Sequence, residues 1–362
     1  MEQSMVPRTS GYPPSRRRPT VAVVGATGAV GTEMVRCLEA RRFPLTDLRL
    51  FASARSAGKS VAACGTRTIV AALADDAFAG VDIALFAAGS DVAKRYAPVA
   101  VKRGAVVIDN SSAFRRDAAV PLVVPEINAA AIARHHGIIA NPNCVAIIAL
   151  MPLWPIHRRN RVTRLTLATY QAASGAGAAA MAELQESTRA HLDGADYQVK
   201  VLRHPYAFNL FSHDTAIDPA TGYNGEETKV MSEARKILED PMIRISATCV
   251  RVPVLRAHSI AMTFECERPI APADVRDVLA DAPGIRLVDD PERNYFPMPK
   301  DASGQGDVLV GRIRRDLSDP SGRSIALFAS GDQLLKGAAL NAVQIAEHLV
   351  GHAVLAEVGG AA

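Results

Sequence analysis

The stretch TVAVVGATGAVGTEMVRCLEARRF, residues 20–43, decides the fold of the first half of the chain. It opens with a β-branched run typical of a buried strand, continues through three glycines spaced G-x-x-G-x-x-G, and closes with a helical segment. Glycines let a backbone approach a phosphate closely, and the free amides at the start of a helix favour an anion. We therefore predict a dinucleotide site, against the alternative of a tight turn that simply needs glycine. Its predicted residues are Gly25, Thr27, Gly28, Ala29, Val30 and Gly31.

Alternating strands and helices continue after this unit. Compact apolar runs at 48–53, 82–89 and 105–112 each end in small polar residues, and a helical pattern at 90–104 separates the last two. Buried strands that alternate with helices indicate a parallel sheet covered on both faces. We predict an α/β chain whose N-terminal part is a Rossmann-like, doubly wound parallel sheet.

The loop after the second predicted strand, FASARSAGK at 51–59, bears on the choice of nucleotide. An NAD site usually places an acid there to bind the ribose 2′-hydroxyl. This loop has no acid and carries Ser53, Arg55, Ser56 and Lys59, which suit a 2′-phosphate. The sequence thus favours NADP as the cofactor, with a solvated polar loop as the alternative.

The character of the chain changes near residue 161. RVTRLTLATYQ at 161–171 alternates like a strand with one covered face, and 242–267 contains two strand patterns around a proline-containing connection. These patterns predict an α+β domain on an antiparallel or mixed sheet. The pattern of apolar residues at 331–350 predicts a long amphipathic helix. We assign 20–143 with 334–355 to an NADP-binding domain and 144–333 to a catalytic and dimerisation domain. A disordered tail is predicted at 1–19.

Composition excludes several classes of function. Of the formal charge of +4, the tail contributes +3 from four arginines and one glutamate, and the remaining 37 basic and 36 acidic residues predict no nucleic-acid surface. The tail lacks the apolar region of a secretory signal, and no apolar run reaches the roughly 18 residues of a membrane span. The five scattered cysteines form no CxxC, which argues against a disulfide framework or a metal site and favours a cytoplasmic protein.

A lone cysteine follows a short apolar run in GIIANPNCVAIIAL, residues 137–150. If a helix begins near Cys144, Asn143 is a suitable N-cap, and the free amides and helix dipole would lower the pKa of the thiol. Cys144 is therefore a candidate nucleophile, with a structural cysteine as the alternative. A nucleophilic thiol needs an acid/base partner and a substrate clamp. His258 lies at the start of a predicted strand, seven residues after Arg251, although a lone histidine is more often structural.

Beyond the tail, nearly the whole chain resembles the aspartate-β-semialdehyde dehydrogenases. The resemblance rests on the ordered motifs GATGAVG, DNSSAFR, VVPEIN, NPNC, YQAASGAG, AFNLFSHD, GYNGEETK, SATCVRVPVLRAHS and KGAALNAVQIAEHL. Relatives that reduce N-acetyl-glutamyl phosphate typically have NPGCY at the cysteine, whereas this chain has NPNCVA, which favours the semialdehyde enzyme. Arg116 departs from the family pattern, which commonly has an apolar residue at that position.

The resemblance implies a role for each matched residue. Cys144 would form the acyl-enzyme, His258 would act as the acid/base, and Gln171 would orient the substrate. Arg251 would hold the α-carboxylate of the substrate, and Glu226 would meet its amino group. Without the family pattern, Gln171 could be a polar residue at a strand end, and the neighbouring Glu227 could take the place of Glu226.

Two further sets of residues follow from the resemblance. Arg115 and Lys229 would bind the phosphate that enters or leaves, although each could be an ordinary surface charge. Ser174, Gly175 and Asn341 would line the nicotinamide side of the site.

The resemblance implies the NADP-dependent reductive dephosphorylation of L-4-aspartyl phosphate to L-aspartate-4-semialdehyde, through a thioester on Cys144. The reaction is reversible and phosphate-dependent, and it would serve lysine, threonine and methionine biosynthesis. The family also implies a homodimer or homotetramer. The alternatives are a sister acyl-phosphate reductase, such as N-acetyl-gamma-glutamyl-phosphate reductase, and a non-catalytic NADP-binding paralogue.

Overall fold

The structure is a computed structural model that describes residues 18–351. The predicted tail at 1–19 lies outside the described residues except for Arg18 and Pro19, and so do 352–355 of the predicted first domain. Within 18–351, every helix is too short or too polar to span a bilayer.

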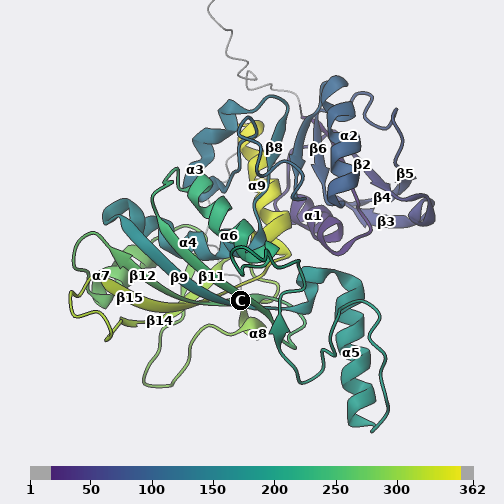
Figure 1. Ribbon diagram of the computed structural model, residues 1–362. Helices are drawn as coiled ribbons and strands as arrows, with labels where there is room; N and C mark the ends of the chain where they lie inside the picture. The colour runs from purple at the N-terminus through teal and green to yellow at the C-terminus, as the bar shows by residue number, and fades with distance from the viewer. Residues whose placement is uncertain (1–17, 352–362) are drawn as a thin grey trace, which may run out of the picture.

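The N-terminal part of the chain forms a six-stranded parallel sheet in the order β5-β2-β1-β6-β7-β8. Its strands are β1 (Thr20–Val24), β2 (Asp47–Ala52), β5 (Ala71–Ala72), β6 (Ile83–Phe86), β7 (Val106–Asp109) and β8 (Ile138–Ala140). Helix α2 (Ser90–Lys102) packs on one face, and α1 (Ala29–Ala40) with α9 (Leu340–Leu349) packs on the other (Figure 1). The strand order runs outward from β1 in both directions, which confirms the predicted doubly wound fold.

Short elements that the sequence analysis does not predict decorate this sheet. Strands β3 (Ser60–Ala63) and β4 (Thr66–Ile69) form an antiparallel hairpin next to β2. The others are the 3₁₀ turns η1 (Ala54–Ser56) and η2 (Ala129–Arg134) and the short helix α3 (Pro125–Asn128).

The second sheet has seven strands in the order β10-β11-β9-β12-β15-β14-β13. They are β9 (Val162–Gln171), β10 (Phe211–Ser212), β11 (Arg244–Arg251), β12 (His258–Cys266), β13 (Ile285–Leu287), β14 (Val308–Arg315) and β15 (Ser324–Gly331). Strand β9 pairs in parallel with β11 and antiparallel with β12, so the sheet is mixed. Along β9, Leu165, Leu167, Thr169 and Gln171 are buried at alternate positions, as predicted.

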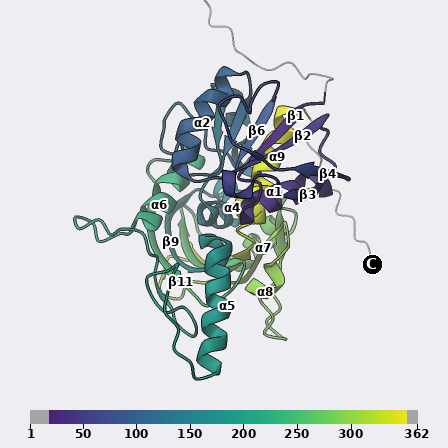
Figure 2. The same cartoon turned by 90° about the vertical axis from the view of Figure 1, so that its right-hand side faces the viewer.

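Helices α4 (Cys144–Arg159), α6 (Gly225–Ile237) and α7 (Pro272–Ala280) bury their apolar side chains against this second sheet in one continuous core. Helix α5 (Ala178–Leu192), which follows the turn η3 (Ala173–Ala176), extends away from both sheets in two perpendicular views (Figures 1 and 2). The short helix α8 (Pro299–Ala302) precedes β14.

The final helix begins later than the sequence pattern predicts. Gly331 is the last residue of β15, and a π-helical turn, η4 (Leu335–Ala339), comes before α9. The carboxylate of Asp332 accepts hydrogen bonds from the amides of Leu334 (2.9 Å) and Leu335 (3.3 Å), so the helical segment starts after this residue. Helix α9 then packs on α1 and the first sheet.

Candidate active site

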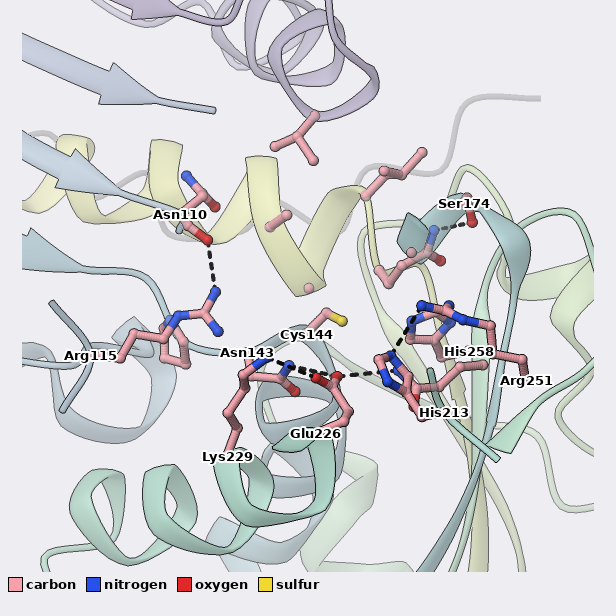
Figure 3. Close-up of a pocket in the computed structure, with 18 residues that line it drawn as sticks. Asn110, Arg115, Asn143, Cys144, Ser174, His213, Glu226, Lys229, Arg251 and His258 are labelled. Carbon is pink, nitrogen blue, oxygen red and sulfur yellow. Dashed lines mark hydrogen bonds and ion pairs between the residues drawn. The ribbon is translucent and has the colours of Figure 1, made fainter. Parts of the chain in front are cut away.

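A cavity of about 300 Å³ lies between the two sheets and is lined by side chains from both (Figure 3). It brings together most of the residues predicted from the sequence, although these are spread over more than 220 positions of the chain. The predicted residues that line it are Val30, Arg115, Cys144, Gln171, Ser174, Gly175, Glu226, Lys229, Arg251 and His258.

The pairing of three strands places Gln171, Arg251 and His258 at one edge of the second sheet. Gln171 and Arg251 are the last residues of the parallel strands β9 and β11 and are direct partners in the register. The antiparallel strand β12 begins with His258 at the same edge, where Ser259 pairs with Tyr170 of β9. Three polar side chains that are far apart in sequence therefore meet at this edge of the sheet.

His258 presents an N–H group to the cavity. Its Nδ1 accepts a hydrogen bond from the Ala172 amide at 3.0 Å, so the neutral imidazole carries its proton on Nε2. The buried Nε2 atom has no hydrogen-bond partner within residues 18–351. Burial, with a smaller contribution from the charge of Arg251, lowers the pKa of His258 to about 3. The imidazole is thus a neutral hydrogen-bond donor with room for a ligand.

Cys144 is the first residue of α4, and Asn143 is its N-cap, as predicted. The Asn143 Oδ1 atom accepts hydrogen bonds from the amides of Val145 (2.9 Å) and Ala146 (3.2 Å). The half-buried Cys144 lies in the middle of the labelled residues in Figure 3. Gly337 of η4 packs on it, since a Cβ atom at residue 337 would lie 2.9 Å from Cβ of Cys144.

The predicted lowering of the thiol pKa is wrong for this arrangement of the site. Burial and the nearby Glu226 carboxylate raise the pKa of Cys144 to about 12. Arg115, Arg251 and the amide of Val145 act in the opposite direction, but they do not outweigh the loss of hydration. The helix terminus can be read from the sequence, whereas the burial around the sulfur depends on segments far away in the chain.

Glu226, and not its neighbour Glu227, faces the cavity. Its carboxylate accepts hydrogen bonds from Nδ2 of Asn143 (2.8 Å) and Nε2 of Gln171 (3.3 Å). Burial alone would raise the pKa of Glu226. His213, which carries a charge once it is protonated in acid, lowers this pKa together with the charge of Lys229 and these two hydrogen bonds, to about 2. Its carboxylate is therefore ionised at neutral pH and can receive a cation.

Glu227 has a structural position instead. It completes a capping box at the start of α6 with Asn224, whose amide donates to the Glu227 carboxylate at 2.8 Å. Its other oxygen accepts the amide of Cys249 at 2.9 Å. The alternative that Glu227 takes the place of Glu226 in the site is thus wrong.

Arg251 has one open end in the cavity. Its Nε donates to Asp214 at 3.0 Å, and its Nη2 lies 3.0 Å from both Asp214 and Nε2 of His213. The buried Nη1 atom finds no partner among the described residues. A buried guanidinium nitrogen with unused hydrogens can bind an anion that enters the cavity.

A second pair of cations lies on the other side of the sulfur. Arg115 is held by the carbonyls of Asn141 (2.9 Å) and Asn110 (2.7 Å) and by Glu233 (3.4 Å). Lys229 contacts Glu226 at 3.4 Å and is a third exposed. In Figure 3, Cys144 lies between Arg115 on one side and His258 with Arg251 on the other. The sulfur therefore has an arginine side chain on each side.

Arg116 lines a neighbouring cavity of about 460 Å³ that shares Arg115 and Lys229 with the first. Its side chain is exposed. The added positive charge of Arg116 thus lies next to the predicted phosphate residues.

The glycine loop fits the diphosphate of a dinucleotide. Gly25 follows β1 with φ +85°, and a Cβ atom there would lie 2.8 Å from the carbonyl oxygen of Ala87, so the turn requires glycine. Gly28 is the N-cap of α1, and no side chain of the described chain caps the amides of that helix. These amides remain available to an anion at the crevice between β1 and β6, where the strand order reverses.

The remaining predicted cofactor residues lie near this loop or behind the cavity. Thr27 is exposed in the loop itself, and Ser53, Arg55 and Ser56 follow the adjacent strand β2. Asn341 does not line the cavity. Its side-chain amide donates to Val123 (2.9 Å) and Asn141 (2.7 Å), and its side-chain oxygen accepts from Lys336 (2.8 Å). Asn341 is therefore bonded to neighbouring protein groups and does not reach the cavity.

Several cavity residues were not predicted. His213 follows β10, Gln333 donates a hydrogen bond to Ser174, and Gly337 packs on Cys144. His213 lies in the quoted motif AFNLFSHD, which could have signalled it. Gly337 lies in the quoted motif KGAALNAVQIAEHL, which could have signalled it as well, whereas Gln333 lies outside the quoted motifs.

Comparison with known proteins agrees with this arrangement. Residues 20–135 match a family model described as the NAD binding domain of semialdehyde dehydrogenase, and 153–336 match the dimerisation domain. The aspartate-semialdehyde dehydrogenase of Synechocystis sp. is 52% identical over 330 residues, covering 91% of this chain and 97% of the relative. The Bacillus subtilis enzyme is 45% identical over 337 residues, covering 91% and 96%.

A solved structure shares both fold and sequence with the chain. The Vibrio cholerae aspartate semialdehyde dehydrogenase II, complexed with ASA, superposes with a TM-score of 0.89. It is 42% identical and covers 92% of this chain and 99% of its own.

The parallel sheet with its glycine loop, and the cavity where a cysteine meets an imidazole and two arginines, define an NAD(P)-binding oxidoreductase of the semialdehyde dehydrogenase class. The chain belongs to the aspartate-semialdehyde dehydrogenase family. This membership supports aspartate-semialdehyde dehydrogenase activity in amino-acid biosynthesis.

Proposed function

We propose that the chain catalyses the NADP-dependent, reversible conversion of L-4-aspartyl phosphate to L-aspartate-4-semialdehyde and phosphate. The observation that carries this proposal is the position of Cys144 between two separate arginines in one cavity. The substrate has an anion at each end, because it carries an α-carboxylate and a phosphate. A cavity with this charge pattern matches both ends.

Each end of the substrate has a proposed partner. The open Nη1 atom of Arg251 would hold the α-carboxylate, and the ionised Glu226 would pair with the α-ammonium group. Gln171 donates to Glu226 and would orient the chain of the substrate. Arg115 and Lys229 would hold the phosphate. The acyl carbon between the two ends would then face the sulfur.

The chemistry proceeds through a thioester on Cys144. The sulfur bonds to the acyl carbon, the bond from that carbon to the phosphate oxygen breaks, and the thiol proton leaves with the phosphate. A bound nicotinamide supplies the hydride that reduces the thioester carbon. His258 donates its Nε2 proton as a hydrogen bond to the oxygen on that carbon. The carbon–sulfur bond then breaks, the semialdehyde leaves, and the sulfur takes a proton from solvent.

An assay of two aldehydes with phosphate tests this function. We expect rapid nucleotide reduction with L-aspartate-4-semialdehyde, no turnover when phosphate is omitted, and at least about 100-fold less with N-acetyl-glutamate semialdehyde. The acetylated nitrogen is neutral, so the buried Glu226 carboxylate loses the pairing with the substrate ammonium group. A preference for the acetylated aldehyde would identify the sister reductase, and inactivity on both would favour a non-catalytic NADP-binding paralogue.

The proposed choice of NADP depends on Arg55, which is exposed at the carboxyl end of β2 beside the glycine loop. Replacing Arg55 with alanine should weaken NADPH binding about 10-fold or more, because a charged contact to the 2′-phosphate is lost, and should leave NADH binding unchanged. Nucleotide fluorescence measures both affinities without substrate. Arg286→Ala on β13 is the matched control, since that exposed arginine lies in the other sheet. Equal losses for the two nucleotides would contradict the proposal.

We also propose that the chain assembles as a homodimer or homotetramer through its second sheet. The support is the match of 153–336 to the dimerisation-domain model. A homodimer or homotetramer is also the assembly that the family resemblance implies.

A further inference from the structure

A chain of hydrogen bonds links the two proposed substrate-binding groups, Arg251 and Glu226, through the loop after β10. Nε2 of His213 lies 3.0 Å from Nη2 of Arg251, and Nδ1 lies 3.3 Å from Oγ1 of Thr215. Oγ1 of Thr215 in turn accepts the backbone amide of Glu226 at 3.0 Å. Figure 3 shows His213 between Arg251 and Glu226 at the cavity wall.

The chemistry of these groups fixes the direction of each bond. A guanidinium can only donate, so Nε2 of His213 must accept from Arg251. The neutral ring then carries its proton on Nδ1, which lies 3.3 Å from Oγ1 of Thr215 and 3.4 Å from the backbone amide of the same residue. In this tautomer the shorter contact is the hydrogen bond, donated by Nδ1 to Oγ1. The Thr215 hydroxyl donates to Oδ1 of Asn224, the N-cap of α6, at 3.4 Å, so the hydroxyl can accept from His213 and donate onward. The path holds only while His213 is neutral.

The same loop decides which part of Arg251 meets a ligand. Asp214 accepts from Nε and lies 3.0 Å from Nη2, and His213 lies 3.0 Å from Nη2, so Nη1 is the nitrogen left for the cavity. At the other end of the path, Oγ1 of Thr215 and Oδ1 of Asn224 both accept hydrogen bonds from the backbone amide of Glu226. The loop thus sets the orientation of the carboxylate site and the position of the ammonium site together.

We infer that His213 and Thr215 are positioning residues that fix the separation of Arg251 and Glu226, and that they make the site select aldehydes carrying an α-ammonium and an α-carboxylate together. The inference deepens the proposed function and rests on it. A substrate that lacks the ammonium group uses only Arg251, so it gains little from a fixed separation. Loss of the link should therefore penalise the amino-acid substrate more than its deaminated analogue.

The link should also depend on pH. Burial lowers the pKa of His213 below its ordinary value. The charged or titratable groups that face it are Asp214 of its own loop, Arg251 of β11, Glu226 and Lys229 of α6, and His258 of β12. Protonation places an N–H group against the Arg251 guanidinium. The link is therefore present above the lowered pKa and is lost as the pH falls through it, which should raise KM on the acid side.

Variants of His213 test the inference with L-aspartate-4-semialdehyde and with succinate semialdehyde, which lacks the amino group. For His213→Ala we expect KM for the first aldehyde to rise about 30-fold, with kcat within about threefold of the wild type. The preference for the first aldehyde over the second should fall about 10-fold. His213→Gln should restore KM, because its amide can accept from Arg251 and donate to Thr215 without titrating. Its KM should no longer rise at low pH.

Thr215 supplies an independent pair of variants, because its side chain is not part of the cavity wall. Thr215→Val keeps the shape and removes the hydroxyl, so it should reproduce the loss of preference, whereas Thr215→Ser should retain it. This pair decides the matter if His213→Ala does not fold. An unchanged preference in Thr215→Val, or a KM in His213→Ala equal to that of the wild type, overturns the link. Inactive wild-type protein would instead contradict the proposed function itself.

Discussion

Replacing Cys144 with alanine should lower phosphate-dependent turnover by about 10⁴-fold or more, while NADPH binding persists. The side chain supplies the only sulfur that lines the cavity among the described residues, and the proposed thioester cannot form without it. The glycine loop and the start of α1 lie on a different element, so the cofactor site should survive the change. Steady-state rates and nucleotide fluorescence on the same preparation measure the two effects separately.

Cys64→Ser is the matched control for a general effect of thiol removal, since Cys64 lies in the turn between β3 and β4, away from the cavity. Its turnover should equal that of the wild type. Mass spectrometry supplies a direct view of the intermediate, because semialdehyde and NADP without phosphate should leave an acyl adduct on Cys144. An alanine variant that keeps more than about a tenth of the activity would remove the thioester from the mechanism.

The fold was predictable because its signals are local. Strands β1, β2, β6 and β7 each have an apolar run closed by small residues, and the glycines at 25, 28 and 31 mark the turn that joins β1 to α1. The two-residue edge strand β5 was not predicted. Alternation along β9 predicted which side chains are buried. The start of the final helix was wrong, because the capping carboxylate of Asp332 is visible only once β15 is known to end at Gly331.

The site was predictable only in part, because its energetics depend on packing between distant segments. Motif resemblance located Cys144 and His258, but the raised pKa of the thiol comes from burial and from Glu226, which lies 82 positions further along the chain. Asn341 looked like a cavity residue from its motif, yet its amide binds Asn141 and Val123. His213 gained a role only when the loop after β10 was placed beside Arg251.

Replacing His258 with alanine should lower kcat about 10²- to 10³-fold with a smaller effect on KM. The reason is the orientation of the ring, in which Nδ1 accepts from the Ala172 amide and Nε2 presents a proton to the cavity. Such a group stabilises the oxygen of the tetrahedral carbon more than it stabilises the bound substrate. His258→Gln supplies an amide donor and should recover part of the loss, which stopped-flow measurement of hydride transfer would show.

The pH dependence separates this role from that of a titrating base. Because the pKa of His258 is lowered to about 3, the ring becomes charged only as the pH falls through that value, and it stays neutral from about pH 5 to 8. The pH profile of kcat should therefore have the same shape in the wild type and in His258→Gln over that range. An acid limb near the ordinary imidazole pKa that disappears in His258→Gln but persists in His213→Gln would show that His258 titrates during catalysis, and the donor assignment would then be wrong.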